Sequence, residues 1–540
     1  MDSLHMEQID GRHRGAVSHP QLEKAPPSIG GPAKPLDADK ILSFHGNFPR
    51  LQWLLAFYLL AGWALWALVW LNSVFVTLVE TPFRCQAGDD FTPATANVTF
   101  DGSCEAAGVD NGTTVACGQE GTQFVFDESA GRTAVSKFAL VCDWASLGSL
   151  ESSIYTVGET VGNLVCLILA DMLGRKIVFF ASSWVVAVAG VVLPLSPNFT
   201  VYIILRFISG CAIAGITYVG WTLALEMLPM RMRSTLPVLA SLLWTLGYVG
   251  LGGLAYLLPN WRPLLWVCIA PSVIWLASYW LIPESLHYLL AHNRRSEALS
   301  LVEKVGRWNG LPVDLDRCLD EEPSAVEAVP KRSVFDVARN PVVAFYTAVY
   351  SVIRIALYLV YTCLSLMGTY LSDDPYLGFV LSGLVELPAP WITAALLQCL
   401  GRRVVQFLSF LLCGLALLAF VFVPVEYDTH WLAVALPLLG KVGAMIAYNM
   451  VDVFQLETTP TTVRTSSFGV TQLFAGIGGF VAPLVVYWGR EAAKLPYVVM
   501  CACALVSALL TLTLPETKDK ELPVDLPNAQ KSKVVRLLFP

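Results

Sequence analysis

The stretch Gly158–Lys176, GETVGNLVCLILADMLGRK, decides the fold of this chain. A long apolar segment carries one acid, Glu159, and ends abruptly in Asp171-Met-Leu-Gly-Arg-Lys176. An apolar helix that ends in a glycine turn, with a carboxylate and two cations beside it, is typical of a helix that reaches a membrane surface. The stretch therefore predicts a transmembrane helix with a charged hinge clamp at its end.

The composition of the whole chain agrees with a membrane protein. Of its 540 residues, 55% are hydrophobic and only 14% are charged, which is too apolar for an ordinary soluble protein. A helix needs about 20 apolar residues to cross a bilayer. Twelve segments have this character, namely residues 52–76, 151–170, 177–196, 201–225, 236–258, 264–282, 341–367, 377–398, 404–424, 431–454, 466–488 and 495–514.

Basic residues in the short loops fall on one side of the predicted membrane, and this side is expected to be cytoplasmic, with both termini. No cleavable signal peptide is visible, so the first span is expected to act as the insertion signal. The net charge of −7 says little about partners, and nothing in the sequence suggests nucleic acid. The basic residues include Arg175, Lys176, Arg231, Arg233, Arg402, Arg403, Arg464 and Lys518.

Four of the 13 cysteines lie in the long loop 77–149, which this topology places outside the cell. Disulfides persist there, so we expect two bonds, and the sequence does not choose among the three possible pairings. The same loop contains two acceptor sequences for N-glycosylation. The cysteines are Cys85, Cys104, Cys117 and Cys142, and the expected glycosylation sites are Asn97 and Asn111.

The two halves of the chain carry the same landmarks at their cytoplasmic helix ends. Asp171 corresponds to Gln398, 227 positions later, and Glu226 corresponds to Glu457, 231 positions later. Pro283-Glu-Ser recurs as Pro515-Glu-Thr, 232 positions later. Marks at nearly one offset indicate a duplicated six-helix unit, the architecture of alternating-access transporters. The expected segments are 1–50 (cytoplasmic), 51–282 (first half), 283–340 (cytoplasmic linker), 341–514 (second half) and 515–540 (cytoplasmic tail).

Several motifs, in their order along residues 42–523, resemble those of the major facilitator superfamily. Within it they are similar to the organic cation/anion/zwitterion transporter family. The resemblance implies an all-α membrane fold of twelve transmembrane helices in two six-helix halves, and transport of a small organic ion across the plasma membrane. Besides Asp171-x-x-Gly-Arg-Lys, the motifs are Leu140-Val-Cys-Asp-Trp144, Asn260-Trp-Arg262, Ile282-Pro-Glu-Ser285, Ser382-Gly-Leu-Val-Glu-Leu-Pro388, Glu457-x-x-Pro-Thr-x-x-Arg464 and Leu514-Pro-Glu-Thr517.

The charged residues at the cytoplasmic helix ends are expected to latch one conformer of the carrier, through contacts with helix ends and with the neighbouring repeat. The alternative is that the bases only set the topology. Leu167, Met172 and Gln398 depart from the family pattern and indicate a weaker latch. The expected latch residues are Asp171, Arg175, Lys176, Arg402 and Arg403, together with Glu226–Arg233 and Glu457–Arg464.

Charges inside the spans are costly and are therefore functional candidates. Glu159 lies twelve residues before Asp171, roughly 18 Å deep at the 1.5 Å rise of a helix. Arg354 lies at a similar depth in the other half. The two residues are expected to form either a mutual ion pair or the two ends of a zwitterion site, and a purely structural pair is the alternative.

Further candidates follow from the resemblance. Glu386 and Lys441 are expected to face the central cavity or a partner helix, and Arg206 is expected either to couple substrate to conformation or to form a buried structural pair. Aromatic faces suit organic cations, although such rings also serve as packing. The resemblance places Trp221, Tyr361 and Tyr448 at cavity positions.

The resemblance places Gly476 where relatives carry a substrate-sorting charge, so charge selection is expected either to rest elsewhere or to be lost. Asp452 is one candidate for this role, and its alternative role is in the inner gate. The intramembrane acids outnumber the obvious cations, which favours organic cations or zwitterions as substrates, with a possible coupled ion. No Walker or HExxH motif is present, so neither a cofactor nor an enzymatic activity is expected. The alternative function is a receptor or scaffold that binds a protein ligand through the glycosylated loop without transport.

Overall fold

The computed structural model describes residues 50–77, 81–87, 104–107, 114–117, 122–127, 131–292, 294–309, 337, 339–423, 430–460, 462–518, 520 and 535. The expected glycosylation sites Asn97 and Asn111 lie outside the described residues. Within them, eleven helical segments are long and apolar enough to cross a membrane, and Leu495–Thr511 is a shorter apolar helix at the twelfth position. The predicted number and order of the spans are therefore confirmed.

The first six spans form one half of the bundle, and the span boundaries differ from the predicted ones by a few residues. The second span differs most, because its helix begins at Ser146. The helices are α2 (Arg50–Leu60), α3 (Gly62–Leu71) and α4 (Ser73–Val76) in span 1, α6 (Ser146–Leu173), α7 (Arg175–Val192), α8 (Phe199–Ala214) and α9 (Gly220–Met227) in span 4, α10 (Leu236–Leu257), and α11 (Trp261–Ile269), α12 (Val273–Leu276) and α13 (Ser278–Leu281) in span 6.

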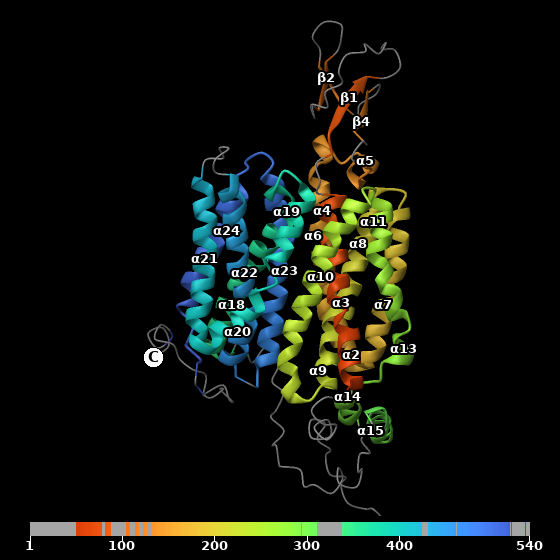
Figure 1. The fold of residues 1–540 in the computed structure, drawn as a ribbon, viewed down its shortest axis with the longest axis vertical. Helices are drawn as coiled ribbons and strands as arrows, with labels where there is room; N and C mark the ends of the chain where they lie inside the picture. The colour runs from red at the N-terminus through yellow and green to blue at the C-terminus, as the bar shows by residue number, and fades with distance from the viewer. Residues whose placement is uncertain are drawn as a thin grey trace, which may run out of the picture.

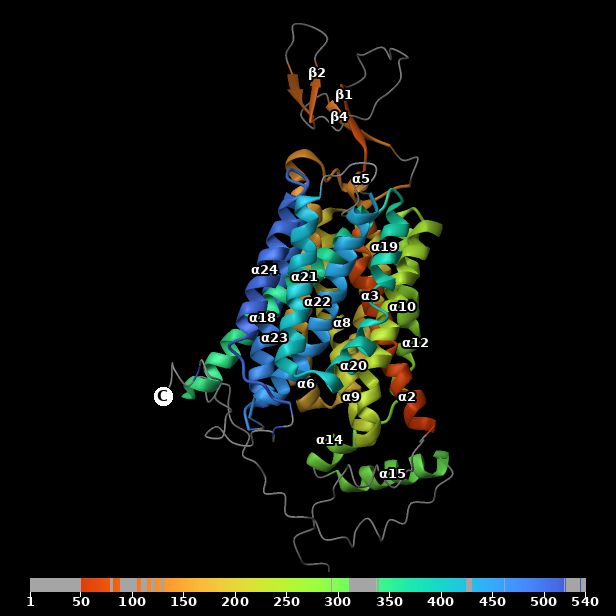
Figure 2. The ribbon, with the colours of Figure 1, turned by 60° about the vertical axis from the view of Figure 1, so that its left-hand side comes forward.

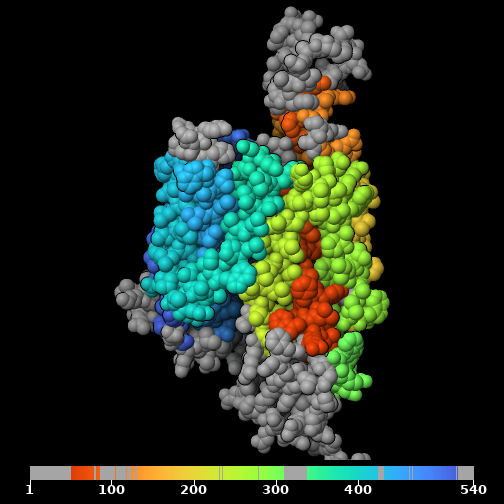
Figure 3. Space-filling view, in the orientation of Figure 1, coloured from red at the N-terminus to blue at the C-terminus, as the bar shows by residue number. Residues whose placement is uncertain are grey.

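The last six spans form the other half, and the two halves lie side by side (Figures 1 and 3). Between the halves, α6 packs on α23 and α10 packs on α19. The helices of the second half are α18 (Pro341–Leu366), α19 (Pro375–Leu384) and α20 (Ala389–Cys399) in span 8, α21 (Arg402–Phe422), α22 (His430–Thr458), α23 (Arg464–Trp488) and α24 (Leu495–Thr511).

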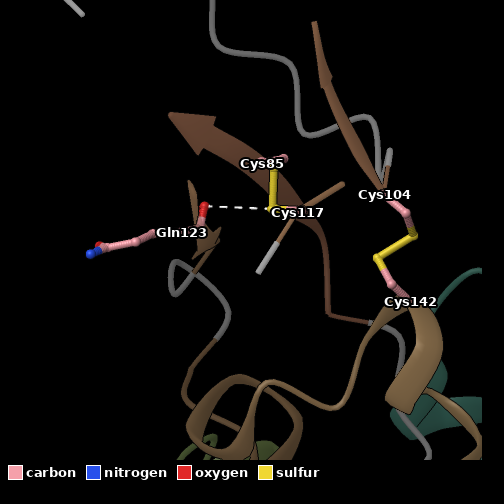
Figure 4. Close-up of a disulfide and its surroundings, with 5 residues drawn as sticks. All are labelled: Cys85, Cys104, Cys117, Gln123 and Cys142. Atoms are coloured by element: carbon pink, nitrogen blue, oxygen red, sulfur yellow. Dashed lines mark hydrogen bonds between the residues drawn. A yellow bond between two sulfur atoms is a disulfide. The ribbon is translucent and has the colours of Figure 1, made fainter. Parts of the chain in front are cut away.

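A small domain projects from one end of the bundle, which we call the outer end (Figure 1). Two antiparallel ribbons, β1 (Phe83–Ala87) with β4 (Thr122–Phe126) and β2 (Glu105–Ala107) with β3 (Thr114–Ala116), make up its described sheet structure. Two disulfide bonds, Cys85–Cys117 and Cys104–Cys142, cross-link it (Figure 4). These are one of the three pairings that the sequence left open.

Helices α14 (Leu286–Ala291) and α15 (Arg295–Asn309) mark the opposite end of the bundle, which we call the inner end (Figure 2). Leu286 and Leu289 of α14 pack against Ala298 and Val302 of α15. These apolar contacts hold the two short helices together beneath the first half.

Contacts between the halves run from the outer end to the middle of the bundle. Phe75 of α4 stacks on Tyr376 of α19, with ring centroids 5.5 Å apart. Deeper, Ser153 of α6 donates a 2.7 Å hydrogen bond to the carbonyl oxygen of Phe480 in α23. Towards the inner end, the consecutive residues 167–169 of α6 are 39%, 53% and 37% exposed. Consecutive helical residues point in different directions, so α6 is incompletely packed there, and the bundle is more open at its inner end.

Candidate functional site

A small cavity, partly open to its surroundings, lies between the two halves at mid-helix depth. Its lining is polar at most positions and includes an acid and two phenols. Sites at the interface of the two repeats are the usual ligand sites of such folds. The lining residues are Thr156, Glu159, Thr160 and Asn163 of α6, Tyr218 of span 4, Tyr358 of α18, and Gln472, Ala475 and Gly476 of α23.

Glu159 is the acid of this cavity and is only 5% exposed. Close packing of α6 on α8 fixes its position, because a Cβ at Gly158 would collide with the Phe207 carbonyl oxygen. The indole of Trp66 and the hydroxyl of Tyr218 lie beside its carboxylate. Among the described residues, no lysine, arginine or histidine forms an ion pair with Glu159.

Tyr218 reaches the cavity from a π-helical turn, Gly215–Val219, that joins α8 to α9. Such turns are frequent at functional sites, because the extra residue redirects the side chains around it. Neither Tyr218 nor Tyr358 was among the sequence candidates, although both line the cavity. The only signal in the sequence was their location in spans 4 and 7.

Arg354 contacts residues of its own half, so the expected ion pair with Glu159 is wrong. Its guanidinium lies 2.6 Å from the Asp452 carboxylate and donates to the side-chain oxygens of Gln455 and Gln472. Arg354 is 4% exposed, whereas the Asp452 side chain is 44% exposed. Gln472 also lines the cavity, so Gln472 lies between the cavity and the guanidinium of Arg354.

Glu386 and Lys441 form a second buried ion pair, with a nitrogen-to-oxygen distance of 2.9 Å and side chains 0% and 1% exposed. Trp244 of the first half donates to the same carboxylate at 3.0 Å, and Tyr361 donates to it at 3.1 Å. Lys441 also donates to Tyr248 of α10 at 3.1 Å. The pair therefore lies at the contact between the halves, and its own charges are mutually neutralised.

Arg206 forms a third buried ion pair with Glu151, and both side chains are fully buried. Arg206 also donates to the carbonyl oxygen of Val69 at 2.9 Å, and Glu151 accepts from Thr77 at 2.9 Å. Glu151 was not a sequence candidate, because it stood at the predicted edge of the second span. The helix begins five residues earlier, at Ser146, and Glu151 therefore lies inside the bundle. Of the two expected roles for Arg206, the buried structural pair fits these contacts.

The three aromatic candidates lie near the cavity but are absent from its lining. Trp221 packs edge-on against Trp63, with ring centroids 5.8 Å apart. Tyr448 lies 5.5 Å from Tyr361 and 6.0 Å from Tyr358, measured between ring centroids. Tyr448 and Tyr361 therefore connect the cavity wall to the Glu386 network.

Gly476 is a point of close approach between the halves. A Cβ at this position would collide with the side chain of Thr160, and one at Gly479 would lie 2.6 Å from a methyl carbon of Thr156. The glycines let α23 approach α6 closely, as small residues do between membrane helices. A charged side chain at position 476 would therefore collide with Thr160 in this conformation.

At the inner end of the first half, the predicted latch residues form a cluster. Arg175 lies 3.2 Å from Asp171 and 3.4 Å from Glu226. Glu284 accepts from the backbone N–H groups of Arg175 and Lys176, at the start of α7. Arg233 donates to the carbonyl oxygen of Leu228 at 3.1 Å, so Arg175 takes the expected place of Arg233 beside Glu226.

The second half repeats this arrangement. Arg402 lies 3.0 Å from Glu457, and Glu516 accepts from the backbone N–H groups of Arg402 and Arg403. Arg464 donates to the carbonyl oxygen of Thr459 at 3.4 Å. These contacts hold loops and helix ends within one half. The sequence predicted contacts with helix ends and also with the neighbouring repeat, and the contacts described here are of the first kind. The sequence analysis did not predict that Glu284 and Glu516 cap these helix starts, although both residues belong to the repeated Pro-Glu motif.

Comparison with known proteins supports a transporter. The sugar (and other) transporter family matches residues 111–523. Solute carrier family 22 member 2 of Mus musculus is 32% identical over 411 residues, which cover 76% of this chain and 73% of that protein. This chain belongs to the solute carrier 22 branch of the major facilitator superfamily. The organic cation transporter protein of Drosophila melanogaster is 31% identical over 412 residues, covering 74% of this chain and 75% of that protein.

The solved structures show the same fold. The partially occluded, inward-open xylose transporter XylE of E. coli aligns with a TM-score of 0.60 at 13% identity, over 88% of this chain and 100% of that chain. XylE bound to a bromodeoxyglucose aligns with a TM-score of 0.54 at 14% identity, over 91% and 99%. As a member of the major facilitator superfamily, the chain is a transmembrane transporter, and the receptor alternative is not favoured.

Proposed function

We propose that this carrier transports small organic cations across the plasma membrane, and that Glu159 binds the cationic group. The observation that carries the proposal is the position of Glu159. It is a buried carboxylate in a cavity between the halves, without an ion pair to any described residue. An isolated charge in a membrane is costly, and a bound cation would offset that cost. One of the relatives is an organic cation transporter protein, which supports the same substrate class.

A cation fits the cavity better than a zwitterion or an anion. A zwitterion needs a second, positively charged site for its anionic end. Arg354 was the candidate for that site, but its guanidinium is held by Asp452, Gln455 and Gln472. Tyr218 and Tyr358 line the cavity instead, and aromatic rings attract organic cations.

We further propose that the outer end faces the cell exterior and that both termini are cytoplasmic, in accord with the basic residues of the inner loops. In this orientation the cavity would exchange with the cytoplasm in the present conformation. The clusters around Arg175 and Arg402 would stiffen the inner end of each half, so that the halves move as rigid bodies during alternating access.

Uptake into cells that express the full chain tests the substrate class. The probes are permanently charged: labelled tetraethylammonium as the cation, glycine betaine as the zwitterion and benzenesulfonate as the anion. We expect saturable uptake of the cation that falls at least about tenfold in Glu159→Gln, since about 1.4 kcal/mol of lost binding is tenfold. The exposed Glu297→Gln is the matched control. Equal cation uptake by Glu159→Gln and the native chain would contradict the proposal.

A further inference from the structure

The charges inside the spans balance except at Glu159. Among the described residues that lie more than four positions from the end of a span, there are four acids and three bases. The three bases each pair with one acid, in Glu151–Arg206, Glu386–Lys441 and Asp452–Arg354. Glu159 is the fourth acid. The cavity therefore carries one carboxylate that these bases do not neutralise.

At the offsets of the inner-end marks, no base accompanies Glu159 in the first half. Glu159 and Glu386 are 227 positions apart, the offset of Asp171 and Gln398, so they occupy equivalent places in the two halves. The equivalent of Lys441, at the offset of 231 that relates Glu226 to Glu457, is Gly210. In the second half the lysine neutralises the acid. In the first half a glycine stands at that offset, and the base of the corresponding helix, Arg206, pairs with Glu151 instead.

The packing around Gly210 leaves no room for a cationic side chain. A Cβ at Gly210 would collide with the carbonyl oxygen of Tyr155 and would lie 3.0 Å from the backbone nitrogen of Glu159. The acid and the glycine are therefore neighbours, as Glu386 and Lys441 are. The fold retains the carboxylate at this place and excludes the lysine.

The other titratable groups around Glu159 are mostly neutral phenols. Tyr155 lies on its own helix, Tyr218 comes from span 4, and Tyr358 and Tyr448 come from α18 and α22 of the other half. The more distant charged groups are those of two ion pairs, Asp452–Arg354 and Glu151–Arg206, and the members of each pair neutralise each other. Trp66 adds an uncharged indole. Without a substrate, the carboxylate therefore lacks a counter-charge, and an isolated charge inside a membrane is costly.

We propose that this carrier exchanges one proton for each monovalent organic cation at Glu159, an inference that rests on the proposed function. The protonated acid faces one side of the membrane, where the cation displaces the proton to water and pairs with the carboxylate. After the halves rock, the cation leaves and a proton from water on the other side returns to the same oxygen. The O–H bond that breaks on one side forms again on the other. Each cycle moves one positive charge in each direction and is electrically neutral.

Purified full-length protein in liposomes tests the exchange, with tetraethylammonium as the probe because its permanent charge prevents leakage as a neutral amine. A gradient of one pH unit, acidic inside, should accumulate the probe roughly tenfold, because the cation and proton ratios become equal when the exchange stops. An entrapped pH dye should report alkalinisation of the lumen as the probe enters. A potassium diffusion potential with valinomycin should leave the final accumulation unchanged.

The native protein distinguishes proton exchange from transport driven by the membrane potential, and the variants test the role of Glu159. Accumulation that follows the diffusion potential and ignores the pH gradient would overturn the exchange but leave cation transport intact. Absence of probe flux would overturn both proposals. Glu159→Gln should lose the proton-driven accumulation and the dye response, whereas Glu159→Asp should keep one proton per cation at a lower rate. Glu297→Gln should behave as the native chain does. Proton coupling that persists in Glu159→Gln would also refute the inference.

Discussion

The ammonium of Lys441 lies 2.9 Å from the carboxylate of Glu386, and a tryptophan of the other half, Trp244, donates to that same carboxylate. The ion pair is thus both the neutralised counterpart of Glu159 and a contact between the halves. If the two halves separate at the outer end, either the hydrogen bond from Trp244 to Glu386 breaks or both residues move together. This dual position makes the pair the most informative place to perturb the structure.

Removal of Lys441 should destabilise the protein strongly. In Lys441→Met the Glu386 charge is left buried and unpaired, and breaking such a pair costs about 3–5 kcal/mol. The double variant Lys441→Met/Glu386→Gln should recover most of this loss, because no uncompensated charge remains. Thermal unfolding of the detergent-purified variants measures both effects. A double variant as unstable as the single one would show that packing, and not charge, dominates.

Gly476→Ala should hinder transport by wedging α6 and α23 apart. The new Cβ would collide with the Thr160 side chain, and overpacking of this kind costs about 1–3 kcal/mol. We expect cation uptake to fall by about tenfold at equal surface expression, as about 1.4 kcal/mol implies. Thr160→Ala removes the two nearest atoms, so the double variant should regain activity. Normal uptake in Gly476→Ala alone would refute the steric role of this glycine.

Glu284 and Glu516 should contribute similarly to the stability of their halves. Each carboxylate accepts backbone N–H groups at the start of a helix, α7 in one case and α21 in the other. Loss of such a cap costs about 0.5–2 kcal/mol, so Glu284→Ala and Glu516→Ala should lower the unfolding temperature by comparable amounts. Glu297→Ala, on the exposed face of α15, serves as the control. A large asymmetry between the two variants would contradict the structural repeat at the inner end.

Peptide mapping of the unreduced protein should recover the links Cys85–Cys117 and Cys104–Cys142. Paired replacement of Cys104 and Cys142 by alanine should destabilise the outer domain by about 2–4 kcal/mol, because the unfolded loop regains conformational freedom. Protease resistance of this domain reports the change. A peptide that links Cys85 to Cys104 or to Cys142 would disprove the pairing.

The sequence predicted the number and order of the spans well, because apolar length is a local signal. It could not predict partners across the bundle. Arg354 and Glu159 match in depth, but depth does not fix the direction in which a side chain points, and Arg354 contacts Asp452. Glu151 was missed because a shift of five residues in a helix start moved it into the interior. The sequence analysis interpreted Gly476 as the loss of a substrate-sorting charge. Its role in packing depends on its contact with Thr160 of α6, which the sequence does not show.

The outer domain is anchored to the first half of the transporter. Asn260 accepts from the backbone of Arg132 at 3.0 Å, and the Trp261 backbone donates to the Arg132 carbonyl oxygen at 3.0 Å. Phe138 packs against the rings of Tyr202 and Trp261. If the outer domain moves rigidly with the first half, its outermost part is displaced further than the helices during a rotation of that half. A fluorophore on the outer domain would therefore magnify each rocking movement into a displacement visible in single molecules.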